Sequence, residues 1–256
     1  MQILTVLNVF SRILAVFSLL MLFPVGVGFW YGNPVTPFLK ALGVALLVAG
    51  VVWIITQNHV REMKARDGFL LATMTWVLLP VFGALPLLYQ IETLSFTDAY
   101  FEATSGLTTT GATVLEGIDK LPESINFWRS FLVWVGGMGI IVLSVAILPL
   151  LGVGGSQIFK AETPGPMKDN KLTPRITQTA KGLWFVYFLM TVTCALCFYF
   201  AGMTGIDAVV HAFSTMGLGG FSTHDASFAY WHSSTIDGIA VFFMLVAGIN
   251  YATHFQ

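Results

Sequence analysis

Two segments of this chain, 109 residues apart, carry variants of one pattern. The first runs from Asp98 to Val114 as DAYFEATSGLTTTGATV, and the second runs from Asp207 to Thr223 as DAVVHAFSTMGLGGFST. Each copy predicts a short helix followed by a loop rich in Thr or Gly. Non-helical backbone at membrane depth is tolerated only where it is buried in protein or lines a water-filled path. In an apolar chain, a duplicated loop of this kind therefore indicates a pore.

The composition places this pattern in a membrane protein. The chain has 256 residues, of which 56% are hydrophobic and 10% are charged, and its mean hydropathy is +0.79. Soluble domains are about 25% charged.

A spanning helix needs about 20 mostly apolar residues, which predicts an all-α polytopic fold with six spans: Leu4–Trp30, Thr36–Thr56, Gly68–Tyr89, Phe127–Leu151, Gly182–Ala201 and Ser234–Phe255. We interpret the first span as a retained helix with a kink at Pro24. The net charge of -1 gives no indication of nucleic-acid binding.

Basic residues predict the orientation of these spans. The loops 58–67 and 152–181 hold most of the Lys and Arg residues. The positive-inside rule therefore places both loops, and the N-terminus, in the cytoplasm. The two clear spans between these loops already return the chain to the same side. The segment 91–126 must consequently begin and end outside. It is rich in acidic residues, and such a mouth attracts cations.

The short apolar helix Phe96–Leu107 is expected to be re-entrant. Its 12 residues cover about 18 Å as a helix, too little to cross a core of about 30 Å. It should enter the membrane and return as the extended segment Thr108–Gly111. The segment Gly205–Met216 with its loop Gly217–Gly220 repeats this design. The predicted organisation is two leading helices (1–58), a first pore-loop repeat (59–151), a cytoplasmic basic loop (152–181) and a second pore-loop repeat (182–256).

The residues of both loops suit the selection of a small cation. Backbone carbonyls replace the hydration shell of an ion without adding a charge that would trap it. Gly permits the backbone angles that such a lining needs. The C-terminal end of each half-helix, which carries partial negative charge, points at its loop. The carbonyls of four residues are the main candidates for ion contact: Thr109, Thr110, Leu218 and Gly219.

Four ionisable residues on the half-helices are expected to support the loops. Asp98 and Asp207 are interpreted as N-terminal caps, with ion ligation at the mouth as the alternative. Glu102 and His211 occupy equivalent positions and are expected to brace the loops from behind. No enzymatic activity is predicted, because Ser105 has no His/Asp pair placed to activate it. The CxxC pair Cys194 and Cys197 lies in an apolar run without a second ligand pair, which favours a packing role.

Several motifs resemble the TrkH/KtrB/HKT superfamily of K+ transporters, most closely its TrkH branch. They are Gly106–Thr113, Gly136–Leu143, Ala146–Pro149, Pro164–Lys171 and Gly219–Ser227. The resemblance implies four helix–loop–helix repeats around a central K+ path, a homodimer, and gating by a cytosolic nucleotide-binding regulator like TrkA. It implies a selectivity filter at six residues of this chain: Thr109, Thr110, Gly111, Leu218, Gly219 and Gly220.

The chain departs from this family in containing only the first two repeats. Because it stops inside the last predicted helix, we expect a fragment, with two chains completing one pore as the alternative. The predicted function is K+ transport across the bacterial inner membrane as the pore-forming subunit of a Trk-type system, with K+ as the transported ion and no cofactor. The alternatives are a secondary cation carrier, whose repeats are often inverted, and a non-conducting membrane protein.

Overall fold

The computed structural model describes residues 2–59, 63–147 and 176–249. Within these ranges the regular secondary structure is helical and contains no strand. The chain forms two compact units. The first comprises residues 1–104 and 122–128, and the second comprises residues 105–121 and 129–256.

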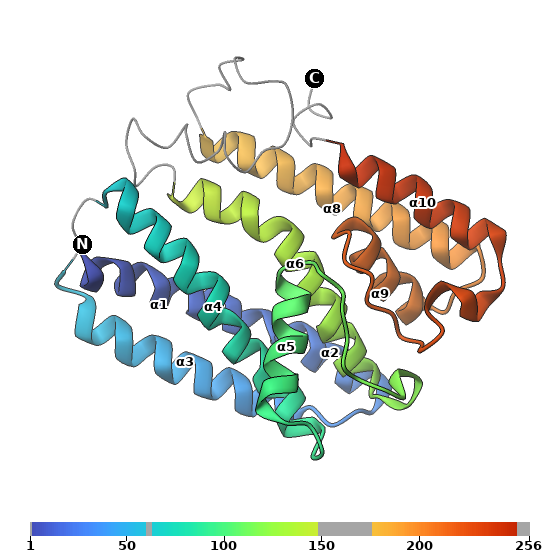
Figure 1. The fold of residues 1–256 in the computed structure, drawn as a ribbon, viewed down its shortest axis with the longest axis horizontal. Helices are drawn as coiled ribbons and strands as arrows, with labels where there is room; N and C mark the ends of the chain where they lie inside the picture. Colours follow the sequence, from blue (N-terminus) through green and yellow to red (C-terminus); the bar gives the residue numbers. More distant parts are fainter. Residues whose placement is uncertain (1, 60–62, 148–175, 250–256) are drawn as a thin grey trace. The chain divides into compact units, whose positions relative to one another are not determined.

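The first unit is a bundle in which α1, α3 and α4 contact one another (Figure 1). Its helices are α1 (Ile3–Leu20), α2 (Leu22–Tyr31), α3 (Thr36–Thr56), α4 (Ala65–Gln90) and the start of α5 (Phe96–Leu107). Polar contacts join α1 to the end of α3. The Asn8 amide donates to Thr56 Oγ1 (3.2 Å), and the Thr5 hydroxyl donates to the His59 carbonyl (2.7 Å). These bonds satisfy polar groups that would otherwise be costly among apolar helices.

The predicted kink in the first span is a break between α1 and α2. The two helices are separated at Met21, three residues before Pro24. Proline has no N–H to donate, and its ring clashes with the carbonyl four residues earlier, here that of Leu20. Pro80 and Pro86, in contrast, lie inside α4 without interrupting it.

The second unit packs around an aromatic cluster that joins three helices. Its helices are η1 (Ile118–Lys120), most of α6 (Glu123–Ile147), α8 (Ile176–Phe200), α9 (Gly205–Met216), η3 (Ser227–Trp231) and α10 (Ser234–Gly248). Trp134 of α6 stacks on Tyr187 of α8 and lies 5.2 Å, between ring centroids, from Phe213 of α9. The Trp134 indole N–H also donates to Thr191 Oγ1 (3.0 Å). This cluster fixes α9, and with it the loop that follows, against α6 and α8.

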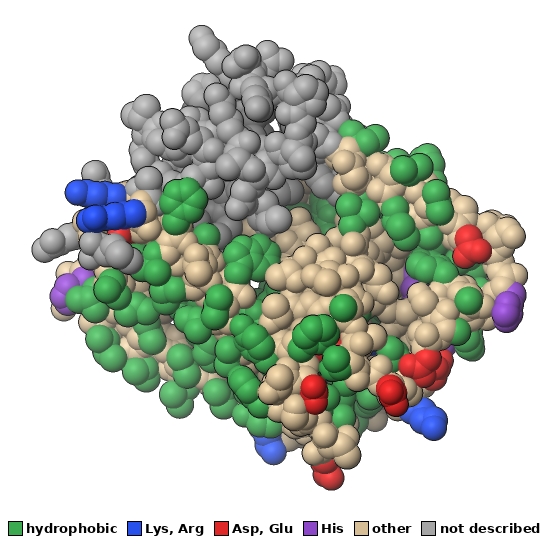
Figure 2. Space-filling view, viewed as in Figure 1, with side chains coloured by type: hydrophobic (Ala, Val, Ile, Leu, Met, Phe, Trp, Pro, Cys, Tyr) green, Lys and Arg blue, Asp and Glu red, His purple; other side chains and the backbone are tan. Residues whose placement is uncertain are grey.

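Four of the described helical segments are long and apolar enough to cross a membrane: Ile3–Tyr31, which comprises α1 and α2, Thr36–Thr56, Arg66–Gln90 and Gly182–Phe200. They leave large hydrophobic side chains uncovered, for example Leu47 and Ile55 on α3 and Phe185 on α8. Figure 2 shows hydrophobic side chains spread widely over the visible surface. An exposed apolar surface of this extent is typical of a membrane protein rather than a soluble one.

The half-helices agree with the sequence prediction residue for residue. The structure has α5 at Phe96–Leu107 and α9 at Gly205–Met216, each 12 residues long. The spans predicted at 127–151 and 234–255 run into residues outside the described ranges, as does most of the basic loop 152–181. The end of that predicted loop is nevertheless helical, because α8 already begins at Ile176. The predicted domain boundaries stay a prediction.

Candidate functional site

Both half-helices begin with the same pair of hydrogen bonds. The Ser95 hydroxyl accepts from Asp98 N (3.1 Å) and donates to Asp98 Oδ2 (2.7 Å). Thr204, 109 residues later, makes the same bonds with Asp207 (3.3 and 2.7 Å). Ser95 and Thr204 thus act as the N-caps of the two helices. The interpretation of Asp98 and Asp207 as the caps is wrong by three residues: each lies in the first helical turn and fixes the cap hydroxyl.

The backbone conformation of the two loops is also repeated. Thr109 and Leu218 have φ of 55° and 56°, and Gly111 and Gly220 have φ of 72° and 110°. The residues between them, Thr110 and Gly219, do not have positive φ. A β-branched residue such as Thr rarely takes a left-handed conformation, which costs free energy and persists only when the surrounding structure enforces it. Both loops hold this strain at equivalent positions.

A serine braces each loop from inside its half-helix. Ser105 Oγ donates to the Ala112 carbonyl and Ser214 Oγ donates to the Phe221 carbonyl, both at 2.6 Å. The carbonyls of the same two serines accept from the loop amides, Thr110 N at 2.8 Å and Gly219 N at 2.9 Å. These matched contacts tie the turn and the return of each loop to the end of its helix. They account for the Ser that recurs in both sequence copies.

The two loops lie directly against each other within the second unit. A Cβ built on Gly111 would overlap the carbonyl of Gly219. The φ of Gly111, +72°, is a second reason why only glycine suits this position. Helix α6 supports both loops from the side. Gly136 is so close to the Leu107 carbonyl that a Cβ would overlap it, and Val133 fills the space beside Gly219. Glycine in α6 therefore permits the close approach of backbone that positions the loops.

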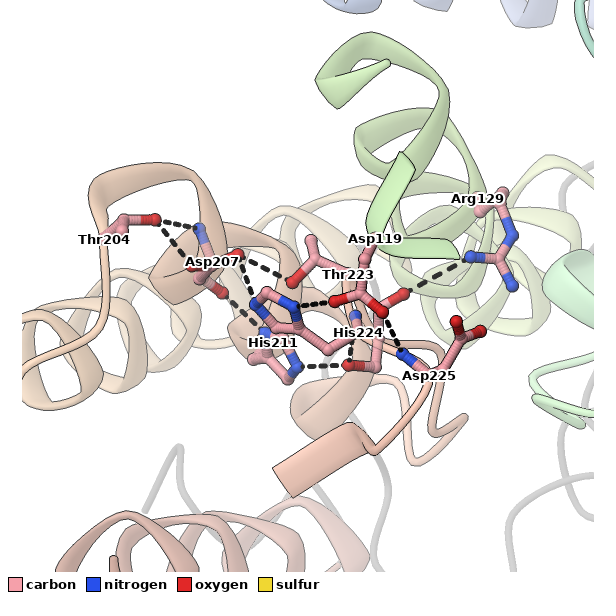
Figure 3. A network of polar contacts seen from close by, with 9 residues as sticks. Asp119, Arg129, Thr204, Asp207, His211, Thr223, His224 and Asp225 are labelled. Atoms are coloured by element: carbon pink, nitrogen blue, oxygen red, sulfur yellow. Dashed lines mark hydrogen bonds and ion pairs between the residues drawn. The ribbon is translucent and has the colours of Figure 1, made fainter. Parts of the chain in front are cut away.

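Arg129 is a buried cation that contacts both loops. Its side chain is 1% exposed. Nη2 donates to Thr113 Oγ1 of the first loop (3.1 Å), and Nη1 donates to the Ser222 carbonyl of the second (3.3 Å). The guanidinium also lies 4.5 Å from the centroid of the Phe221 ring. Figure 3 shows the bond between Arg129 and the second loop.

A polar network connects α9, its loop and η1 (Figure 3). The Thr223 hydroxyl donates to Asp207 Oδ1 (2.6 Å), and His224 Nε2 lies 3.6 Å from the same oxygen. His224 Nδ1 bonds Asp119 of η1, and Asp119 Oδ2 accepts from Asp225 N (3.2 Å). The bonds from His224 and Asp225 lower the pKa of the Asp119 carboxyl below its usual value of 3.8. The segment after the first loop is thereby joined to the segment after the second.

His211 links α9 to the return of the second loop. Its Nδ1 lies 2.8 Å from the Asp207 carbonyl, which can only accept, so Nδ1 carries the proton of that bond. Its Nε2 lies 2.9 Å from Ser222 Oγ, which also accepts from His224 N (3.0 Å). His211 therefore contacts the return of the second loop, and its bracing role stays a prediction.

The structure gathers the six predicted loop residues, Asp207 and His211 in the second unit, whereas Asp98 and Glu102 belong to the first. Sequence reasoning missed Arg129, Asp119 and His224. Arg129 could have been noticed as a charged residue inside a predicted span, where ionisable groups are rare and often functional. The other two residues gave no comparable signal.

The family model for TrkH, described as a cation transport protein, matches residues 36–256. The chain belongs to the TrkH family. With four apolar helices among the described residues, membership of this family makes the chain a multi-pass protein of a bacterial membrane. The family therefore confirms the resemblance drawn from the sequence motifs.

Relatives in other bacteria agree with this assignment. The chain is 48% identical to the Trk system potassium uptake protein TrkH of Vibrio parahaemolyticus, over 100% of this chain and 53% of the relative. It is 52% identical to TrkH of Escherichia coli, over 86% of this chain and 46% of the relative. The crystal structure of the potassium transporter TrkH from Vibrio parahaemolyticus matches with a TM-score of 0.85 and 45% identity, covering 100% of this chain and 52% of that one. The chain thus spans about half the length of the relatives it matches.

Proposed function

We propose that the complete protein carrying this sequence transports K+ across the bacterial inner membrane, and that the two loops form part of its selectivity filter. The proposed ion-contacting residues are Thr109, Thr110, Gly111, Leu218, Gly219 and Gly220. Asp98, Glu102, Asp207 and His211 are proposed to support the loops. Transport needs no catalytic residue and no cofactor besides the ion itself.

The observation that carries this proposal is the repeated alternation of φ in the two loops. Positive φ at Thr109 and Gly111, on either side of Thr110, recurs at Leu218 and Gly220, on either side of Gly219. Alternation of left- and right-handed residues turns successive peptide groups towards one side, as in the anion-binding nests of N–H groups. The opposite face of such a segment gathers carbonyl oxygens, which are the ligands of K+ filters. The close contact of Gly111 with Gly219 allows both loops to line one path.

Two loops cannot surround an ion, so the proposal includes further loops from the rest of the pore. Because the chain spans about half the length of its relatives, we propose that the remaining half supplies two more repeats. We also propose a homodimer, with the basic segment 152–181 on the cytoplasmic side, where a TrkA-like nucleotide-binding subunit would meet it. The parallel direction predicted for the two repeats supports a channel-like path over an inverted-repeat carrier.

The test is ion flux in liposomes, with the reversal potential measured in K+ and Na+ gradients. The complete protein should conduct K+ in preference to Na+ and restore growth of K+-uptake-deficient cells at low K+. The 256-residue chain, inserted alone, should give no selective flux. A complete protein that reaches the membrane and conducts both ions equally would refute the proposal. Selective flux through the 256-residue chain would show that copies of this half complete a pore without the other.

A further inference from the structure

We infer that Arg129 is a positioning residue that clamps the returns of the two loops together and thereby sets the K+ preference of the filter. The inference rests on the proposed function of the loops. It goes beyond that function because it assigns selectivity to a residue outside both loops, on helix α6. Three observations support it. Arg129 contacts equivalent positions of the two loops, the residues that it contacts are themselves held by hydrogen bonds, and its side chain is buried.

Arg129 contacts residues at equivalent positions of the two loops, through a side-chain hydroxyl in the first and a backbone carbonyl in the second. Thr113 lies two residues after Gly111, and Ser222 lies two residues after Gly220, at the same offset of 109 residues that relates the two sequence copies. One guanidinium thus reaches corresponding points of both returns, at 3.1 and 3.3 Å. The planar fork of Arg presents several donors in fixed directions, whereas the single ammonium of Lys is a point charge. Only Arg is suited to bridging both points at once.

The two partners of Arg129 are themselves fixed. Thr113 Oγ1 also accepts from Leu115 N (3.1 Å), which orders the chain after the first loop. Ser222 Oγ bonds both His211 Nε2 (2.9 Å) and His224 N (3.0 Å), which orders the chain after the second. A bridge between two ordered segments sets the distance between them.

The position of the guanidinium over an aromatic ring adds a third restraint. Arg129 lies over Phe221, whose carbonyl accepts from Ser214 Oγ at the end of α9. A cation over a ring face is attracted by the ring's quadrupole, more strongly where water is excluded. Because Arg129 is 1% exposed, its hydrogen bonds do not compete with bulk water. A buried guanidinium does not exchange these partners for water as an exposed one would, so the clamp holds a fixed geometry.

The decisive experiment compares the K+/Na+ permeability ratio of four variants of the complete protein in liposomes. Arg129→Gln and Arg129→Lys should each lower the ratio by about tenfold, which corresponds to a loss of about 1.4 kcal/mol in discrimination between the two ions. Thr113→Val, which keeps the cation and removes one anchor, should also lower it. Thr113→Ser keeps the hydroxyl and is the matched control, with the wild-type ratio.

A reduced flux at an unchanged ratio in Arg129→Gln would overturn the inference, because a merely structural role predicts that result. If Arg129→Gln does not reach the membrane, an unchanged ratio in Thr113→Val overturns it.

Hydrogen exchange of backbone amides separates this inference from the proposed function. In detergent, Arg129→Gln should speed exchange in the segments 108–115 and 218–224 and leave α8 unchanged. Unchanged exchange in both segments would refute the clamp, whether or not the protein selects K+. If Arg129→Gln speeds exchange in both segments but the wild-type protein conducts K+ and Na+ equally, the clamp is upheld and the filter is refuted.

Discussion

The substitution Gly111→Ala tests the contact between the two loops most directly. The φ of Gly111 is +72°, and a Cβ at this position would overlap the carbonyl of Gly219. The chain offers a matched control in Gly117, whose φ of +68° is nearly the same but which has nothing within 4 Å of an added Cβ. Gly117→Ala therefore introduces the backbone strain alone, whereas Gly111→Ala introduces the strain and a collision.

The magnitudes follow from these two terms. A left-handed conformation costs a non-glycine residue about 1–2 kcal/mol, and this term is common to both variants. Forcing an additional methyl group into a packed site costs about 1–3 kcal/mol more, and it applies only at Gly111. Because the obstacle there is backbone and not a flexible side chain, the Gly219 carbonyl must move. We expect Gly111→Ala to destabilise the protein by about 2–5 kcal/mol in total, and Gly117→Ala by the first term alone.

The assays are thermal unfolding in detergent and the reversal potential in liposomes. A displaced Gly219 carbonyl changes the distance from oxygen to ion, so Gly111→Ala should reduce the preference for K+ over Na+ by about tenfold, equivalent to about 1.4 kcal/mol. Gly117→Ala should keep the wild-type preference. The reasoning is refuted if both variants lose the same stability, or if Gly111→Ala keeps the wild-type preference while it is folded.

Three further predictions follow from the described contacts. Ser105→Ala and Ser214→Ala each remove one brace and should cost about 1 kcal/mol in unfolding free energy; a clearly larger loss at one site would contradict the equivalence of the loops. The lowered pKa of Asp119 means that its bond with His224 stabilises the protein above pH 3.8 and is lost as the pH falls through the lower folded value. The melting temperatures of wild type and Asp119→Asn should consequently differ at about pH 6 and converge below pH 3.8, and a constant difference would argue against this pairing. Trp134→Phe removes the indole bond to α8 and should cost about 1 kcal/mol without changing ion preference; altered preference would mean that the aromatic cluster does more than hold α9.

The half-helices could be predicted from the sequence because two independent constraints agreed on them. Each has 12 residues, too few to span a membrane, and each recurs at the same offset. Positive φ could be anticipated at Gly111 and Gly220, where glycine permits it. It could not be anticipated at Thr109 or Leu218, because neither residue favours the left-handed region and the surrounding hydrogen bonds impose it.

The contacts around the loops could not be predicted because they are tertiary. Arg129 lies 16 residues from Thr113 and 93 residues from Ser222 in the sequence. Asp119 and His224 are separated by 105 residues. The helix caps are a different case, since a Ser or Thr three residues before an acidic residue is a recognisable local pattern. Ser95 and Thr204 carried that signal in the sequence.

The differences between the two copies indicate which atoms of the loops matter. Thr109 and Leu218 have φ within one degree of each other, yet only Thr109 has a side-chain oxygen. The serine braces and the loop amides are likewise matched, whereas Glu102 in one copy is replaced by His211 in the other. If side-chain oxygens held the ion, the second loop would lack a ligand at Leu218. Backbone carbonyls are the one set of ligands that both copies keep in equivalent conformations, which favours ion contact through the backbone and leaves the side chains to hold each loop in place.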